Sequence, residues 1–142
     1  MATDTDRVAR KLGLLAASTP ETTVAYFTAL IEAVKARTNQ NIIAPMVVEN
    51  LSGVEVERFL EISDRDGLVQ YLLDGIMNLQ AAGCEFVAIA GNAAHEVYLY
   101  LVEVSPLPVV SLRAAAAAEP DKNPIQAHVD RLADMMTNTS RA

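Results

Sequence analysis

The sequence holds few of the residues from which many active sites are built. It has one cysteine, Cys84, and no tryptophan among its 142 residues. One cysteine excludes an intrachain disulfide, and it also argues against a zinc site built from thiolate ligands. We therefore expect no metal and no cofactor, so that any chemistry would depend on other side chains.

Basic residues are also scarce. The chain has 11 lysines and arginines against 18 acidic residues, which gives a formal net charge of −7. No basic stripe is present, which argues against nucleic acid and against an anionic membrane surface. No apolar run approaches the roughly 20 residues of a membrane-spanning helix, and the N-terminus does not resemble a signal peptide. We expect a cytoplasmic protein that binds neither nucleic acid nor membrane.

Hydrophobic residues make up 51% of the sequence, and they are arranged in short runs that alternate with helical patterns. This alternation predicts an α/β fold, in which a four-stranded parallel sheet carries helices on both faces. We expect residues 1–10 to form a flexible arm and 11–142 a single domain. Pro45 suggests that its strand lies toward a sheet edge. The predicted strands are 11–16, 42–48, 85–90 and 109–112, and the main helices are about 20–37, 54–60, 63–82, 92–103 and 124–137.

Ligands of parallel sheets bind beyond the carboxyl ends of the strands. Four loops are expected there, and the first lacks the glycines of a dinucleotide-binding turn. Ser18 and Thr19 offer hydroxyls to a ligand, although each could equally be a turn or cap residue. The candidate ligand-binding residues in these loops are Ser18, Thr19, Asn50, Gly91, Asn92, Ala93 and Ser111.

The turn after the third strand carries the residues best suited to chemistry. The strand is expected to pass directly into a helix, which would place unpaired N–H groups and the positive end of the helix dipole there. Asn92 would be an N-cap, a ligand donor or both. His95 is a candidate general base or acid, although a lone histidine is more often structural. Glu49, at the end of the second strand, is a second candidate acid or base, or else a solvated charge. Cys84 is expected at the opposite end of the sheet.

Two segments resemble the aspartate/glutamate racemase superfamily. Residues 11–23, KLGLLAASTPETT, are similar to its first strand and the Pro-Glu-x-Thr sequence that follows. Residues 82–95 are similar to its Ala-Gly-Ala-x-strand-Cys-Asn-Thr-Ala-His motif. The resemblance covers about residues 11–113 and implies one lobe of the racemase fold. Asn92, His95, Pro20, Glu21 and Thr23 keep the family residue.

The departures from the family pattern bear on the chemistry. The family's first catalytic cysteine falls on Gly91, and the threonine of the same motif falls on Ala93. The family usually has a second, similar lobe that carries a second cysteine, whereas this chain is expected to form one lobe. Racemisation in this family uses one thiol on each side of the α-carbon, so the resemblance implies that cysteine-dependent racemisation is lost.

Two functions remain open at this stage. In the first, an enzyme without cysteine isomerises, eliminates or cyclises a small carbonyl or carboxylate compound, for instance as a biosynthetic tailoring step. His95 would move the proton, Asn92 and nearby N–H groups would hold an oxyanion, and Glu49 or Ser18 would assist. In the second, the chain is a non-catalytic relative that binds a metabolite or a partner protein. A homodimer could close the cleft that a single lobe leaves open.

Overall fold

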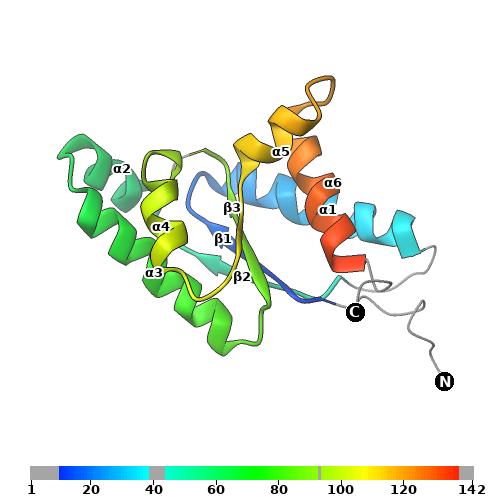
Figure 1. Cartoon of the computed structure of the whole chain (residues 1–142), viewed down its shortest axis with the longest axis horizontal. Coiled ribbons are helices and arrows are strands. Elements are labelled where there is room, and N and C mark those ends of the chain that lie inside the picture. The colour runs from blue at the N-terminus through cyan, green and yellow to red at the C-terminus, as the bar shows by residue number, and fades with distance from the viewer. Residues whose placement is uncertain (1–9, 39–43, 93, 138–142) are drawn as a thin grey trace.

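The computed structural model describes residues 10–38, 44–92 and 94–137, and shows a parallel sheet between two layers of helices (Figure 1). This architecture confirms the predicted four-stranded α/β fold. The strands lie in the order β2-β1-β3-β4, and every neighbouring pair is parallel. They are β1 (Leu12–Ala16), β2 (Met46–Asn50), β3 (Phe86–Ala90) and β4 (Val109–Val110).

The two central strands are composed of apolar residues and glycine. Every residue of β1 and β3 is buried, as expected for strands covered on both faces. The edge strand β2 is only half-buried, and it runs from Met46 to Asn50, which is shifted toward the C-terminus relative to the predicted range 42–48. Pro45 lacks an N–H group, and its carbonyl accepts a hydrogen bond from the Leu12 amide at 3.0 Å just before the pairing begins. Residues 42 and 43 lie outside the described residues.

The helices divide between the two faces of the sheet. On one face, α1 (Pro20–Thr38) and α6 (Pro124–Thr137) pack together over one apolar cluster, and α5 (Leu112–Ala118) lies against α6. On the other face, α2 (Gly53–Glu61), α3 (Arg65–Ala81) and α4 (Tyr98–Val104) cover a second cluster. Figure 1 shows the two groups on opposite sides of the strands. The last helix covers the residues predicted for it, about 124–137.

The segment after β3 differs from its prediction. A helix was expected from about residue 92 with Asn92 at its start, but the chain first forms a 3₁₀ turn, η2 (His95–Val97), and α4 begins only at Tyr98. The His95 amide bonds to the Asn92 carbonyl at 3.0 Å, and no side chain caps either segment. Asn92 is therefore not the N-cap of α4, and the positive end of a helix dipole predicted beside Asn92 is not found there.

Two further boundaries are corrected. Ser111 and Leu112 were expected in the fourth strand, but Ser111 is the N-cap of α5 and its hydroxyl accepts a bond from the Ala114 amide at 3.1 Å. The helix predicted over 63–82 is α3, which begins at Arg65, and its N-cap is Asp64, whose carboxylate accepts from the Gly67 amide at 2.9 Å. Gly83, which follows the C-cap residue Ala82 of α3, has a φ of +90°.

The arm predicted at residues 1–10 falls almost entirely outside the described residues. Within them, no helix combines the length and apolar character that a bilayer crossing needs.

Candidate functional site

The carboxyl ends of the strands carry two hollows of different size. The first, here called the β3–β4 crevice, has a volume of about 30 Å³. The second, the β1–β2 groove, is open and has a volume of about 720 Å³. The crevice is lined by Ile89, Gly91, Asn92, Ala94, His95, Tyr98, Val109, Val110, Ser111, Leu112 and Arg113. The groove is lined by Ala17, Ser18, Thr19, Pro20, Leu51, Ser52, Gly53, Val54, Glu57, Arg58 and Glu61.

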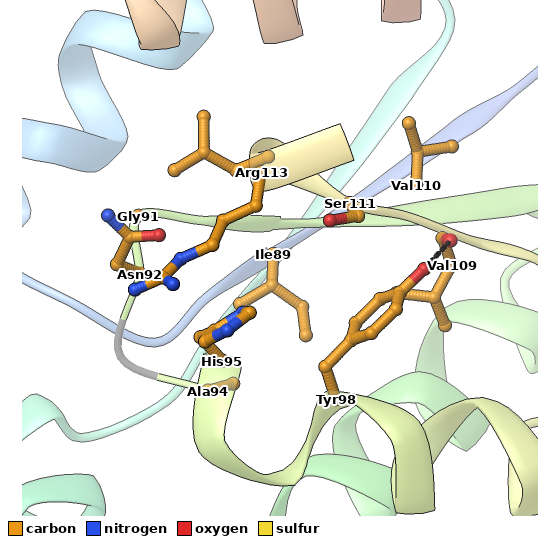
Figure 2. A pocket seen from close by; sticks show the side chains of 11 residues that line it. Ile89, Gly91, Asn92, Ala94, His95, Tyr98, Val109, Val110, Ser111 and Arg113 are labelled. Atoms are coloured by element: carbon orange, nitrogen blue, oxygen red, sulfur yellow. Dashed lines mark hydrogen bonds between the residues drawn. The ribbon is translucent and has the colours of Figure 1, made fainter. Parts of the chain in front are cut away.

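The polar groups of the crevice come from two segments. Asn92 and His95 follow β3, while Ser111 and Arg113 lie at the start of α5. Figure 2 shows the Arg113 side chain extending from α5 toward Asn92 and His95. Among the described lining residues, Arg113 alone carries a permanent charge, and it takes part in none of the ion pairs found in the described parts of the chain. The crevice therefore presents a guanidinium, an amide and an imidazole together.

Arg113 was not among the residues predicted from the sequence. It directly precedes the run of alanines from Ala114 to Ala118, which makes up most of α5. Had Ser111 been recognised as the N-cap of a helix, Arg113 would have been a candidate site residue. A residue in the first turn of a helix that directly follows a strand lies at the carboxyl edge of the sheet. Tyr98 was also not singled out from the sequence as a site residue, and it forms part of the crevice wall, where its hydroxyl donates to the Val109 carbonyl at 3.1 Å.

Gly91 adopts a backbone conformation that other residues rarely take. Its φ is +89°, and a Cβ atom built on it would lie 3.2 Å from Ser18 Cβ and 3.3 Å from Ser18 Oγ. Both the conformation and the close approach favour glycine. A cysteine at position 91 would therefore be strained in this backbone. The same contact places Ser18, which lines the groove, next to Gly91, which lines the crevice, so the two hollows adjoin there.

The groove holds the predicted residues Ser18 and Thr19. Thr19 also caps α1, since its hydroxyl accepts a bond from the Thr22 amide at 3.2 Å. Ser52 caps α2 by accepting from the Glu55 amide at 3.3 Å. The charged residues of the groove are Glu57, Glu61 and Arg58, and Arg58 is paired with Glu55 at 2.8 Å. The groove thus combines hydroxyls with an excess of carboxylates.

Two other predicted residues, Glu49 and Asn50, do not lie with His95. Glu49 lies at the outer edge of the sheet, where the Asn78 amide donates to its carboxylate at 2.8 Å, and it lines neither hollow. Asn50 is exposed at the end of β2 and lines neither hollow. Ala93 lies outside the described residues. Cys84 is buried two residues before β3 begins, at the opposite end of the sheet, and this burial raises the pKa of its thiol.

A buried polar pair lies behind the crevice and was not predicted. His128 of α6 is 0% exposed, and its Nδ1 lies 2.7 Å from the hydroxyl of Tyr26 on α1. Its Nε2 lies 3.0 Å from the carbonyl of Val110. Desolvation by burial lowers the pKa of His128 to about 4 and raises the pKa of Tyr26 to about 12, and the nearby Gly91 amide opposes the latter change. Both side chains are thus uncharged near neutral pH.

Metal binding finds no support in the described part of the chain. No group of three or more histidine, cysteine, aspartate or glutamate side chains is close enough there to hold an ion.

Comparisons with known proteins point to one family. The model of the Asp/Glu/Hydantoin racemase family matches residues 15–126. A Yersinia pestis protein described as a candidate Asp/Glu racemase is 24% identical, with a TM-score of 0.73 over 78% of this chain. An aspartate racemase homologue from Pyrococcus horikoshii is 25% identical, with a TM-score of 0.70 over the same share. The chain covers 48% of each of these two structures, about half their length. None of the curated proteins matches. The match of a family model to most of the sequence shows that the chain belongs to the Asp/Glu/hydantoin racemase family.

Proposed function

We propose that the chain binds a small carboxylate compound in the β3–β4 crevice and moves a proton to or from the carbon beside the carboxylate. The observation that supports this proposal is the convergence of Arg113, Asn92 and His95 on one crevice at the carboxyl edge of the sheet. Such chemistry covers isomerisation, elimination and cyclisation, each of which begins with proton transfer next to a carbonyl or carboxylate group.

Each of the three side chains has a distinct role in this proposal. Arg113 pairs with the ligand carboxylate, for which the planar guanidinium offers two parallel N–H donors. The Asn92 amide donates to an oxygen that gains negative charge as the proton leaves. His95 is exposed, so its imidazole is open to the ligand and to solvent, and it acts as the base or acid.

The size of the crevice limits what can enter it. A volume of about 30 Å³ accommodates one small group and not a whole metabolite. We therefore place the carboxylate in the crevice and the remainder of the ligand over Gly91 toward Ser18 and the groove. The absence of a side chain at Gly91 leaves this path open, since a Cβ atom there would contact Ser18.

A second candidate function is binding without turnover. It is favoured by the glycine at position 91, because this residue stands where the family motif has its catalytic cysteine and because its backbone disfavours a cysteine. Cys84, the single cysteine of the sequence, lies at the opposite end of the sheet. Either function would thus proceed without a thiol.

The two functions are separated by proton exchange in heavy water. Aspartate, glutamate and hydantoin are incubated with the protein in D₂O, and deuterium at the α-carbon is followed by proton NMR. If the protein turns over one of these compounds, the wild type should exchange its α-proton and His95→Gln should not. Arg113→Gln should bind the compound about tenfold more weakly or worse, because a hydrogen bond to a charged group contributes roughly 1.5–3 kcal/mol. Arg65→Gln, a change of an exposed arginine on α3, is the matched control and should behave as the wild type.

The possible outcomes decide between the candidates. Binding that depends on Arg113 without any exchange supports the binding function. If neither aspartate nor glutamate binds, the assignment of a carboxylate site for this substrate class is wrong.

We also propose that a second copy of the chain covers the open side of the groove. Val54, on its rim, is 79% exposed, and a second copy seated on the groove would remove this apolar side chain from water. Light scattering at micromolar concentration should give the mass of a dimer, and Val54→Asp should reduce it to that of a monomer. A monomeric wild type would contradict this proposal.

A further inference from the structure

The Tyr26–His128 pair is an exception within an otherwise apolar layer. It lies between α1, α6 and the sheet, in the cluster formed by residues such as Leu14, Phe86 and Leu132. Both rings are 0% exposed, and they meet edge to face with centroids 5.5 Å apart. Burial of polar groups lowers stability unless all of them are hydrogen-bonded, and an apolar pair would fill the same space without this requirement. The pair therefore calls for an explanation beyond packing.

The hydrogen-bond partners determine the direction of the network. The Val110 carbonyl can only accept, so His128 Nε2 carries the proton and donates to it at 3.0 Å. His128 Nδ1 is then the acceptor for the Tyr26 hydroxyl at 2.7 Å. Thr22, one helical turn before Tyr26 on α1, has its Cγ2 3.8 Å from a Cβ atom built on Gly91, so this part of α1 packs against the turn after β3. The Gly91 backbone also lowers the pKa of Tyr26, against the effect of burial. The pair thus connects the turn after β3 with the end of β4.

These two backbone positions are also walls of the crevice. Gly91 and Val110 both line it, while Tyr26 and His128 do not. The network contacts the crevice walls from behind, from the layer of α1 and α6. Val110 is followed directly by Ser111, the N-cap of α5, whose first turn carries Arg113. A displacement of Val110 would therefore move Arg113 relative to Asn92 and His95.

We propose that Tyr26 and His128 are positioning residues of the β3–β4 crevice, which hold the Gly91 turn and the end of β4 at the separation that lets Arg113 and His95 act on one ligand. This inference rests on the function proposed above. Neither side chain reaches the ligand, because both are fully buried. Their role is to fix the backbone from which the ligand-binding side chains extend.

The test uses Tyr26→Phe, which removes one hydroxyl and keeps the ring. Its matched control is Tyr71→Phe, because the Tyr71 hydroxyl also meets a backbone amide, that of Ser52, at 2.9 Å, but on the side of the groove. In the protein without ligand, hydrogen exchange of the Gly91 and Ser111 amides should become at least about tenfold faster in Tyr26→Phe and stay unchanged in Tyr71→Phe. Imidazole nitrogen NMR should show the Nε2–H tautomer of His128 in the wild type.

Turnover supplies a second readout. The rate of α-proton exchange should fall about tenfold or more in Tyr26→Phe, since small displacements of catalytic groups reduce rates strongly. His128→Gln is the second variant, because its amide can still donate to Val110 while the imidazole acceptor for Tyr26 is removed. We expect faster exchange at Gly91 in this variant and less change at Ser111.

The outcomes separate this inference from the proposed function. Unchanged amide exchange at Gly91 and Ser111 in both variants would overturn the positioning role. A wild type that neither binds nor turns over the three compounds, but whose Gly91 and Ser111 amides respond as described, would overturn the proposed function and retain the structural coupling.

Discussion

The two hollows at the carboxyl edge of the sheet differ in nearly every property. The β3–β4 crevice is small and has a cation, an imidazole and an amide on its walls. The β1–β2 groove is more than twenty times larger, and its charged residues are mainly acidic. The polar pair of Tyr26 and His128 lies behind the crevice, whereas apolar residues such as Val56 and Leu72 belong to the cluster on the face that carries α2 and α3.

The difference shows that volume alone does not identify a site. An acidic groove repels a carboxylate, whereas a crevice with a guanidinium attracts one. Because the crevice is narrow, it accommodates only part of the ligand. The chemistry of the walls therefore favours the crevice over the groove as the proposed anion site. The groove is left for the part of the ligand that carries no charge, or for a second protein surface.

Acid should affect the crevice side of the molecule most. The pKa of His128 is about 4 in the folded protein against 6.5 for a free side chain. Above pH 6.5 its contribution to stability is complete, and as the pH falls toward 4 the unfolded chain takes up the proton first. The free energy of unfolding should therefore drop by about 3 kcal/mol between these values. Urea unfolding at several pH values measures this, and His128→Gln should show a smaller drop.

The next largest loss of stability is expected for Gly91→Ala. A side chain at a φ of +89° costs roughly 1–3 kcal/mol, and here Ser18 must also move because a Cβ atom would lie 3.2 Å from its Cβ. Gly83→Ala is the matched control, since its φ is +90° and the nearest atom is Lys11 Nζ at 3.8 Å. Urea unfolding should show Gly91→Ala as the less stable variant. Equal losses would show that the contact with Ser18 is harmless.

Removing the two serine caps compares the hollows directly. Ser111 caps α5 beside the crevice, and Ser52 caps α2 beside the groove. Each change to alanine should cost about 1 kcal/mol of stability, because one helix amide loses its acceptor. Only Ser111→Ala should also weaken carboxylate binding, as measured by calorimetry, because it loosens the turn that carries Arg113. If Ser52→Ala weakens binding more, the anion site belongs to the groove.

The smallest effect is expected for Glu49→Gln. Glu49 bonds to Asn78 on the protein surface and lines neither hollow. A glutamine can keep an oxygen toward the Asn78 amide, so stability should change by less than about 0.5 kcal/mol. Proton exchange should be that of the wild type. A clear loss of exchange would return Glu49 to the role of acid or base that its position after β2 first suggested.

The sequence predicted the fold well because apolar patterning dominates it. The runs 11–16 and 85–90 contain little but apolar residues, and the central strands β1 and β3 lie within them. The start predicted at about residue 124 is that of α6, where Asn123 Oδ1 accepts from the Ile125 amide at 2.9 Å and Pro124 is the first helical residue. Such signals are local, so they can be recognised without knowing the tertiary structure.

The errors arise where tertiary contacts decide. The helix predicted from residue 92 begins later, at Tyr98. No cap residue marks this start, and the buried Val97 and Leu101 pack in the same cluster as α3. His128 was passed over although it lies three residues after Ile125 and four before Leu132, on the apolar face of its helix. Its partner Tyr26 is 102 positions away in the sequence, and no local pattern joins the two. Arg113 was missed for the same reason, since its neighbours in space come from the turn after β3.

Cys84 offers a practical use of the fold. As the sole sulfhydryl of the sequence, it is 5% exposed, at the edge of the sheet farthest from the crevice. An alkylating reagent reaches it only when α3 and the sheet separate, so the rate of modification reports how often this layer opens. A compound that slows the alkylation of Cys84 is thereby identified as a ligand. This screen requires neither a known reaction nor a reporter group close to the ligand.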